Sequence, residues 1–336
     1  MFVNNDPYTK FIRLWLVTLF LLVIFIITVG GLTRLTDSGL SITEWELFIG
    51  VFPPLNIDQW DFYFNQYKKI PEFKSINYNM SLDEFKVIYY WEYAHRLTAR
   101  LIGIISFFPL IIIYFKHKNK LSRDLKYFSI FILVCLQGFL GWFMVKSGLI
   151  NNTDVSHYRL ASHLSLALIV LSLTFWFILE NLKINKFIIK INRKFLTIFF
   201  IIILIQIILG AFLAGLNGGL IYNSWPDMNG SFLPDDIIKT DLYNFKSLNN
   251  VSVIQFYHRF VAYILIIFLL ILNYFFYIQK KSSKPIIIFN LAVLFQIILG
   301  ILTLITGVKI YYASLHQLGS VFVLTSFLFI FYKNTN

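Results

Sequence analysis

Four histidines stand near the start of apolar stretches that are long enough to form membrane helices. His95 and His258 lie in the similar segments WEYAHR and QFYHR, and the other two are His163 and His316. Ionisable side chains are costly inside a membrane, so they usually mark a functional site. A lone histidine of this kind is often a hydrogen-bonded core residue, but four at repeated positions favour metal ligation. Imidazoles on facing helices can bind haem iron from both sides, so the pattern predicts a haem-binding protein.

A carboxylate accompanies only one of the two similar segments. Glu92 precedes His95 by three residues and therefore lies on the same face of a helix. The equivalent residue of the second segment is Gln255, which has a similar shape but cannot titrate. One interpretation is that Glu92 is an interfacial carboxylate that pairs with Arg96 or Arg100. The asymmetry favours the other interpretation, in which the first half carries out chemistry and the second half retains a haem.

An arginine directly follows each of these two histidines. Arg96 and Arg259 are suited to binding haem propionates, because a guanidinium group binds a carboxylate through two parallel hydrogen bonds. The alternative is that both arginines extend toward the membrane interface without contacting a ligand. Weaker candidates for propionate binding are Arg34, Arg100 and Arg159. The two remaining histidines, His117 and His157, fall in short loops, where we expect solvated side chains.

The composition excludes a soluble globular domain. Hydrophobic residues make up 58% of the 336 residues and charged residues only 14%, whereas globular chains carry about 25% charged residues. The net charge of +12 does not imply nucleic-acid binding, because the basic residues are mostly confined to short loops. Cys135 is the only cysteine, so no intramolecular disulfide or cysteine-based metal cluster can form. The first apolar stretch begins near Leu14, so we expect no separate targeting peptide before it.

Eight stretches satisfy the requirement of roughly 20 apolar residues for a membrane-spanning helix. They cover residues 14–33, 90–115, 127–146, 160–179, 195–215, 257–278, 286–306 and 312–332. We therefore expect an all-α polytopic membrane protein with eight transmembrane helices.

The connections between these stretches differ in charge on the two sides of the membrane. One side, with both termini, holds 16 Lys and Arg residues against three acidic residues, and the opposite side holds 13 basic and 14 acidic residues. Basic residues of short loops stay in the cytoplasm, so we expect both termini there and the long loops 34–89 and 216–256 outside. All four histidine-bearing helices then enter from outside, which places the histidines at similar depth near the outer leaflet.

The chain is also a tandem repeat. Residues 1–180 and 181–336 each contain four apolar stretches, with a histidine on the second and on the fourth. A smaller repeat of the form Gln-x-x-x-Gly occurs at 137–141, 206–210 and 296–300, where small residues allow helices to approach closely. We expect two pseudo-symmetric four-helix bundles, one in each half, with one histidine pair in each bundle.

The two long loops contain many turn-forming and helix-capping residues. The first contains GGLTRLTDSGLSITEW from Gly30 and VFPPL from Val51, and the second contains NSWPDMNG from Asn223. Such sequences favour an ordered structure over a solvated tether. We expect both loops to fold over the outer ends of the bundles.

Together these loop sequences and the segments EYAHR, QFYHR and SLHQLGS resemble the haem A synthase family, most closely the branch shared by alphaproteobacteria and mitochondria. The resemblance covers nearly the whole chain. It implies that haem O enters and that two hydroxylations convert its C8 methyl group to a formyl group, which yields haem A for terminal oxidases. It also implies a resident haem b in the C-terminal half and a link between Glu92 and catalysis. Other members carry a cysteine pair in an outer loop that this chain lacks, so redox control by that pair does not transfer.

On this basis we expect an oxidoreductase of cytochrome oxidase assembly in a bacterial inner membrane rather than a mitochondrial one. The resident haem b would bind His258 and His316. His95 and His163 would face the substrate haem, with Glu92 assisting proton transfer or orienting an oxygen species or water. Expected partners are haem O, the haem O synthase, an electron donor and the lipid bilayer, with no nucleic acid, and the sequence leaves a homo-oligomer open. Two alternatives remain, a di-haem cytochrome b that carries electrons and a haem carrier without chemistry.

Overall fold

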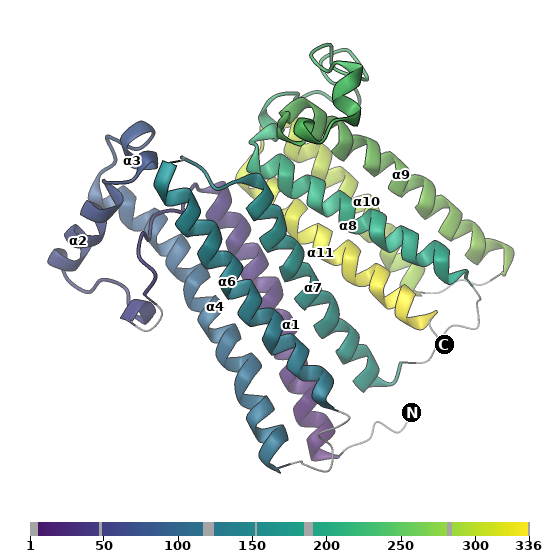
Figure 1. Ribbon diagram of the computed structural model, residues 1–336. Helices are drawn as coiled ribbons and strands as arrows, with labels where there is room; N and C mark the ends of the chain where they lie inside the picture. The colour runs from purple at the N-terminus through teal and green to yellow at the C-terminus, as the bar shows by residue number, and fades with distance from the viewer. Residues whose placement is uncertain are drawn as a thin grey trace. The chain divides into compact units, whose positions relative to one another are not determined.

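The computed structural model describes residues 6–46, 49–116, 124–151, 153–184, 191–280 and 284–334. Within these residues the protein consists of α-helices and short 3-10 helices joined by loops (Figure 1). The only strand-like pairing in this part of the chain is an isolated bridge between Met228 and Ser231. The prediction of an all-α protein is therefore confirmed.

Eight helices of the described chain are long and apolar enough to cross a membrane, as the sequence predicts. In chain order they are α1 (Pro7–Leu35), α4 (Leu82–Lys116), α6 (Phe128–Asn151), α7 (His157–Leu182), α8 (Arg193–Gly215), α9 (Val251–Ile278), α10 (Lys284–Ile305) and α11 (Ile310–Lys333). The shorter elements are η1 (Ile49–Val51), α2 (Ile57–Tyr67), α3 (Pro71–Ser75), η3 (Leu125–Tyr127), η4 (Gly218–Leu220), η5 (Lys239–Tyr243) and η6 (Phe245–Asn249).

Helix α4 begins well before the apolar stretch that predicts it. The sequence places its start near residue 90, but the helix starts at Leu82. Ser81 precedes the first turn and its side chain accepts a hydrogen bond from the Glu84 backbone N–H, while the Glu84 carboxylate accepts one from the Ser81 backbone N–H at 2.8 Å. This capping box satisfies two backbone donors at the helix start. It therefore fixes where the chain leaves the loop and enters α4.

The helices form two compact units. The first unit covers Leu14–Leu171, and the second covers Ser172–Asn336 together with Met1–Arg13. His95 and His163 both lie in the first unit, while His258 and His316 both lie in the second. Each unit therefore contains one histidine pair.

Aromatic side chains fill the centre of the second unit. Phe199 of α8 lies against Phe289 of α10 and Phe327 of α11, with ring centroids 5.8 and 4.8 Å away. All three rings are fully buried. Burying a side chain of this size contributes about 1.5–3 kcal/mol, so these contacts stabilise the packing of the three helices. Near them, Asn273 of α9 and Asn290 of α10 exchange two side-chain hydrogen bonds of 2.9 and 2.7 Å.

In the first unit, α4 packs against its neighbours along the apolar part of its length. The Trp15 indole N–H of α1 donates to the Ile105 carbonyl of α4 at 2.8 Å. The same indole packs edge-on against Tyr127, which lies just before α6. The ring of Phe107 lies 5.0 Å from that of Phe131, which joins α4 to α6.

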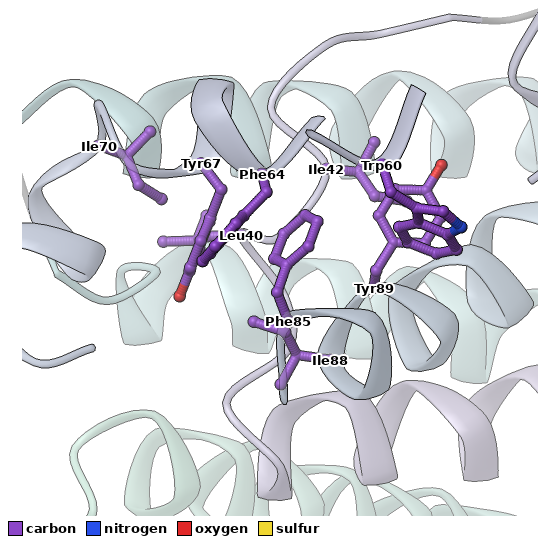
Figure 2. Close-up of a cluster of buried hydrophobic side chains, with 9 residues drawn as sticks. All are labelled: Leu40, Ile42, Trp60, Phe64, Tyr67, Ile70, Phe85, Ile88 and Tyr89. Carbon is purple, nitrogen blue, oxygen red and sulfur yellow. The ribbon is translucent and has the colours of Figure 1, made fainter. Parts of the chain in front are cut away.

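The described residues of the segment between α1 and α4, 36–46 and 49–81, form an ordered structure that we call the cap. Its buried side chains, drawn in Figure 2, surround Phe85 and Tyr89 on the first turns of α4. They come from the loop after α1, from α2 and from the turn before α3, and comprise Leu40, Ile42, Trp60, Phe64, Tyr67 and Ile70. The expectation that this loop is ordered is confirmed for its described residues.

Candidate functional site

In the first unit, α4 and α7 bring His95 and His163 together. The centroids of the two imidazole rings lie 6.5 Å apart, with an angle of 42° between the ring planes. His163 lies in the second turn of α7, near the N-terminal end of this helix. The pairing predicted from the repeated positions is therefore present in the structure.

In the second unit, α9 and α11 bring His258 and His316 together at the same separation. Their ring centroids also lie 6.5 Å apart, with an angle of 79° between the planes. Two metal–imidazole bonds of about 2.0–2.1 Å would place facing rings with centroids roughly 6–6.5 Å apart. Each pair therefore fits the two axial positions of a haem iron. Within the described residues no cluster of three or more His, Cys, Asp or Glu side chains forms another metal site.

A glycine on a neighbouring helix faces each of the four imidazoles. A Cβ atom placed on any of these glycines would lie within 2.7–3.2 Å of the Cε1 atom of the histidine ring, which is closer than normal contact. The four pairs are Gly30 with His95, Gly141 with His163, Gly210 with His258, and Gly300 with His316. The helices therefore approach closely at the histidines, and a larger residue would push the ring out of position.

A glutamine one turn before three of these glycines contacts the histidine backbone. The side-chain amide of Gln137 donates to the carbonyl of His163 at 3.0 Å. Gln206 donates to the carbonyl of His258 at 3.0 Å, and Gln296 donates to that of His316 at 2.9 Å. The sequence shows this Gln-x-x-x-Gly repeat, but it does not show that the repeat contacts the candidate ligands.

Glu92 is buried and fully hydrogen-bonded. Its Oε1 atom accepts from the Arg96 guanidinium, from Nε at 2.9 Å and from NH2 at 2.6 Å. Its Oε2 atom accepts from the Ser41 hydroxyl at 2.7 Å and from the Ile42 backbone N–H at 2.8 Å. The sequence allows Glu92 to pair with Arg96 or with Arg100, and in the structure the carboxylate pairs with Arg96. Ser41 and Ile42 were missed because they lie about fifty residues away in the sequence.

The arginines of α4 hold the cap. Arg96 also donates to the carbonyl of Ile42 at 2.7 Å and to that of Glu44 at 3.0 Å. One turn further along, Arg100 donates to the carbonyl of Glu46 at 2.7 Å. These bonds attach the cap segment that follows Ser41 to the side of α4 next to His95.

The equivalent positions of the second unit attach a different loop in the same way. Arg259 donates to the carbonyls of Tyr222, Ser224 and Asp227 at 2.9, 3.0 and 2.7 Å. Gln255 donates to the same Tyr222 carbonyl at 3.0 Å. The Nε atom of Arg259 is buried and has no hydrogen-bond partner among the described residues, so it is free to bind an acceptor beside His258.

Other residues singled out in the sequence lie elsewhere. Arg34 pairs with Asp37 at 2.7 Å, and Arg159 lies 5.0 Å from the ring centroid of Phe143. The expectation of a solvated His157 is wrong, because this residue is the first of α7 and its ring is buried against Tyr158. His117 lies outside the described residues.

The cap contains one further buried carboxyl group. Glu72 of α3 is only 5% exposed, and its Oε1 atom accepts a hydrogen bond from the Tyr67 hydroxyl at 3.0 Å. Burial raises the pKa of Glu72 from its usual value to about 7, although the hydrogen bond from Tyr67 acts in the opposite direction. The carboxyl group therefore changes its charge near neutral pH.

Comparison with known proteins places the whole chain among close relatives. The cytochrome oxidase assembly protein family matches residues 13–328. The protein named heme A synthase of Pelagibacter ubique (strain HTCC1062) is 59% identical over 336 residues, which cover 100% of both chains. That of Rickettsia bellii (strain OSU 85-389) is 43% identical over 321 residues, 93% of this chain and 94% of the relative. That of Wolbachia pipientis wMel is 40% identical over 326 residues, 95% and 91% of the two chains.

Proposed function

Because the chain belongs to the family of cytochrome oxidase assembly proteins, we propose that its two histidine pairs hold two different haem groups. The function of the chain is haem A synthesis, like that of the relatives it matches over its full length. We assign the substrate, haem O, to His95 and His163, and a resident haem b to His258 and His316. The reaction is then an oxidation, in which the C8 methyl group of haem O becomes the formyl group of haem A.

The observation that carries this proposal is that the two imidazole pairs have the same separation between their rings but differ in the residues beside them. Both pairs have ring centroids 6.5 Å apart, which suits axial ligation of iron. Three residues before His95 stands the ionisable Glu92, whereas the residue three positions before His258 is Gln255. A protein that only relays electrons has little need of this difference. The comparison therefore favours chemistry in the first unit and a retained cofactor in the second.

Glu92 is the residue to which we assign a catalytic role. Its carboxylate is fixed by four hydrogen bonds from Arg96, Ser41 and Ile42. The Ser41 hydroxyl donates to Oε2 and also lies within hydrogen-bond distance of the Ser38 and Ile88 carbonyls. The haem iron would supply redox chemistry when bound, and the four-electron oxidation of the methyl group would also require an external oxidant. Glu92 then accepts or returns protons during the oxidation of the methyl group.

In the second unit the residues are suited to retaining a bound haem. His258 and His316 would ligate the iron of haem b, and the buried Nε–H of Arg259 would donate to a propionate. Gln255 keeps the loop contact of this position without a titratable group.

The protein is an integral membrane protein. We propose that it lies in a bacterial inner membrane with both termini in the cytoplasm. Haem O would come from the haem O synthase, and reducing or oxidising equivalents would pass to or from a separate electron-transfer partner.

Expression in a host that makes haem O but no haem A tests the function directly. We expect haem A to appear in extracted pigments when the chain is expressed, and none when an inactive chain carrying His95→Ala is expressed. Extracts that contain only haem b and haem O would instead support the electron-carrier or haem-carrier alternative.

A further inference from the structure

Three of the four candidate ligands are fixed by the same local device, which we call the glutamine clamp. It consists of a glutamine and, four residues later, a glycine on the helix that faces the histidine. The three clamps are Gln137 with Gly141, Gln206 with Gly210, and Gln296 with Gly300. Residues four apart lie one above the other on a helix face, so both members of a clamp face the same histidine.

The two members of a clamp act on different parts of the histidine. The glutamine amide binds the backbone carbonyl, which fixes the helix turn that carries the ligand. The glycine contacts the Cε1 edge of the ring, which limits its rotation. At His258 the amide nitrogen of Gln206 also lies 3.3 Å from Nδ1 and 3.4 Å from Nε2 of the ring. The clamp therefore restricts both the position and the orientation of the imidazole.

Each clamp also keeps an unused acceptor next to its ligand. The Oε1 atoms of Gln137, Gln206 and Gln296 are buried and have no hydrogen-bond partner among the described residues. The same is true of Nδ1 in His163 and His316, and also of Nδ1 in His95, which has no clamp. Histidines that bind metal usually donate the N–H of the other ring nitrogen to an acceptor, which fixes the tautomer.

His95 is the exception. Gly30 of α1 contacts its ring, but four residues before Gly30 stands Ile26, which has no hydrogen-bonding group. The turn of α4 that carries His95 is instead attached to the cap through Glu92 and Arg96. The ring of His95 is therefore packed as closely as the others, but within the described residues no α1 side chain binds the His95 carbonyl. The contact from α1 to this part of α4 is the Thr33 hydroxyl, which donates to the Trp91 carbonyl at 3.4 Å.

We propose that Gln137, Gln206 and Gln296 are positioning residues that fix three haem ligands, and that His95 is the ligand that opens to admit haem O and release haem A. The proposal rests on the assignment of the substrate to the first unit. A resident haem needs two permanent ligands, and the second unit has two clamps. A substrate haem must arrive and leave, and the first unit has one clamp. His163 then remains the fixed ligand on the substrate side.

Removing a clamp from the second unit tests the positioning role. Gln206→Met and Gln296→Met keep the side-chain length but lose the amide. We expect haem b to pass to excess apomyoglobin about 10–100-fold faster from the purified variants than from the parent. We also expect a changed electron paramagnetic resonance spectrum of the ferric low-spin haem, because its g-values depend on the orientation of the two imidazole planes.

Asn273→Leu provides a matched control in the same bundle. It removes an interhelical amide contact between α9 and α10, away from the histidines. We expect this variant to lose stability but to keep the parent's resonance spectrum. If Gln206→Met does not accumulate, Gln206→Asn, whose amide is one methylene too short to reach the carbonyl, replaces it. Unchanged haem loss and unchanged spectra in both the Gln206 and the Gln296 variants would overturn the positioning role.

Adding the missing clamp tests the role of His95. Ile26→Gln restores the Gln-x-x-x-Gly pattern in α1, and Ile26→Leu is the control without an amide. We expect haem O to pass from the first unit of Ile26→Gln to apomyoglobin about tenfold more slowly than from Ile26→Leu. Gln137→Met is expected to act in the opposite direction. Equal transfer rates in Ile26→Gln and Ile26→Leu would refute the exchange of the His95 bond.

The failure of this inference differs from a failure of the proposed function. If the parent chain makes no haem A in the haem O-producing host, the proposed function is wrong. If the parent makes haem A while the clamp variants release haem at the parental rates, only the clamp is wrong.

Discussion

The Arg96 guanidinium donates two hydrogen bonds to one oxygen of the Glu92 carboxylate, from Nε at 2.9 Å and from NH2 at 2.6 Å. Both side chains are largely buried, so the ion pair is shielded from solvent. The same two side chains hold the cap, because Glu92 also binds Ile42 and Arg96 binds Glu44. A change at either position therefore affects both the ion pair and the attachment of the cap.

The first prediction separates a catalytic role of Glu92 from a structural one. Breaking a buried ion pair by removing one partner costs about 3–5 kcal/mol, so Glu92→Gln and Arg96→Met should lower thermal stability to a similar extent. Losing general acid–base catalysis costs about 10²–10⁴-fold in rate, so only Glu92→Gln should reduce haem A formation that far. Haem O or its hydroxymethyl derivative should then accumulate, while haem b stays bound. Equal losses of haem A in the two variants would leave Glu92 a purely structural role.

The second prediction concerns the resident haem. His258→Ala and His316→Ala should each remove most of the low-spin haem b absorbance from the purified protein, because the iron loses an axial ligand. His95→Ala and His163→Ala should retain it. Visible spectra of the four variants provide the measurement, and a haem b spectrum that survives both changes in the second unit contradicts the ligand assignment.

The third prediction concerns the propionate contact of Arg259. Arg259→Met removes a positive charge next to His258, and the loss of a nearby cation stabilises the ferric form of the haem. We expect the midpoint potential of haem b to fall in a redox titration. Arg193→Met removes the same charge from an exposed position at the start of α8 and should leave the potential unchanged. A potential that is equal in both variants would exclude the contact.

The fourth prediction follows from the buried carboxyl group of Glu72. Its pKa in the folded cap is about 7, above the usual value of 4.5, so the folded state binds the proton more tightly than the unfolded state. The contribution of Glu72 to the stability of the cap should therefore be fully present below about pH 4.5 and be lost as the pH rises through 7. The change in stability can be measured as the hydrogen-exchange protection factors of the backbone amides in residues 57–77 between pH 5 and pH 8. In Glu72→Gln the protection factors of these residues should depend little on pH, and at pH 8 they should exceed those of the parent.

The fifth prediction concerns orientation in the membrane. The excess of 16 basic over three acidic residues on one side predicts that this side faces the cytoplasm. A reporter that is active only outside should work when fused near Asn65 or Lys239. It should fail when fused near Lys120 or Asn185, which lie outside the described residues. The reverse pattern would move all four histidines to the inner leaflet.

The amino-acid sequence is sufficient to predict the membrane-protein class, the eight long helices and the pairing of the histidines. In a bilayer, backbone groups must be hydrogen-bonded within the chain, so long apolar stretches become helices whatever their partners. The recurrence of a histidine near the start of four such stretches then predicts four candidate haem ligands. For this reason the sequence predicts the pairs His95 with His163 and His258 with His316, whose ring centroids lie 6.5 Å apart in the structure.

The groups that surround these histidines become visible only in the folded protein. Ser41 and Ile42 bind Glu92 across about fifty residues of sequence, and Gln206 binds the His258 carbonyl across 52 residues. Such bonds depend on which faces of two helices are in contact and on the path of a loop. Hydropathy and local residue spacing determine neither of these. The burial of Glu92 against Arg96 likewise results from the packing of the fold. So does the absence, among the described residues, of a glutamine that binds the His95 carbonyl.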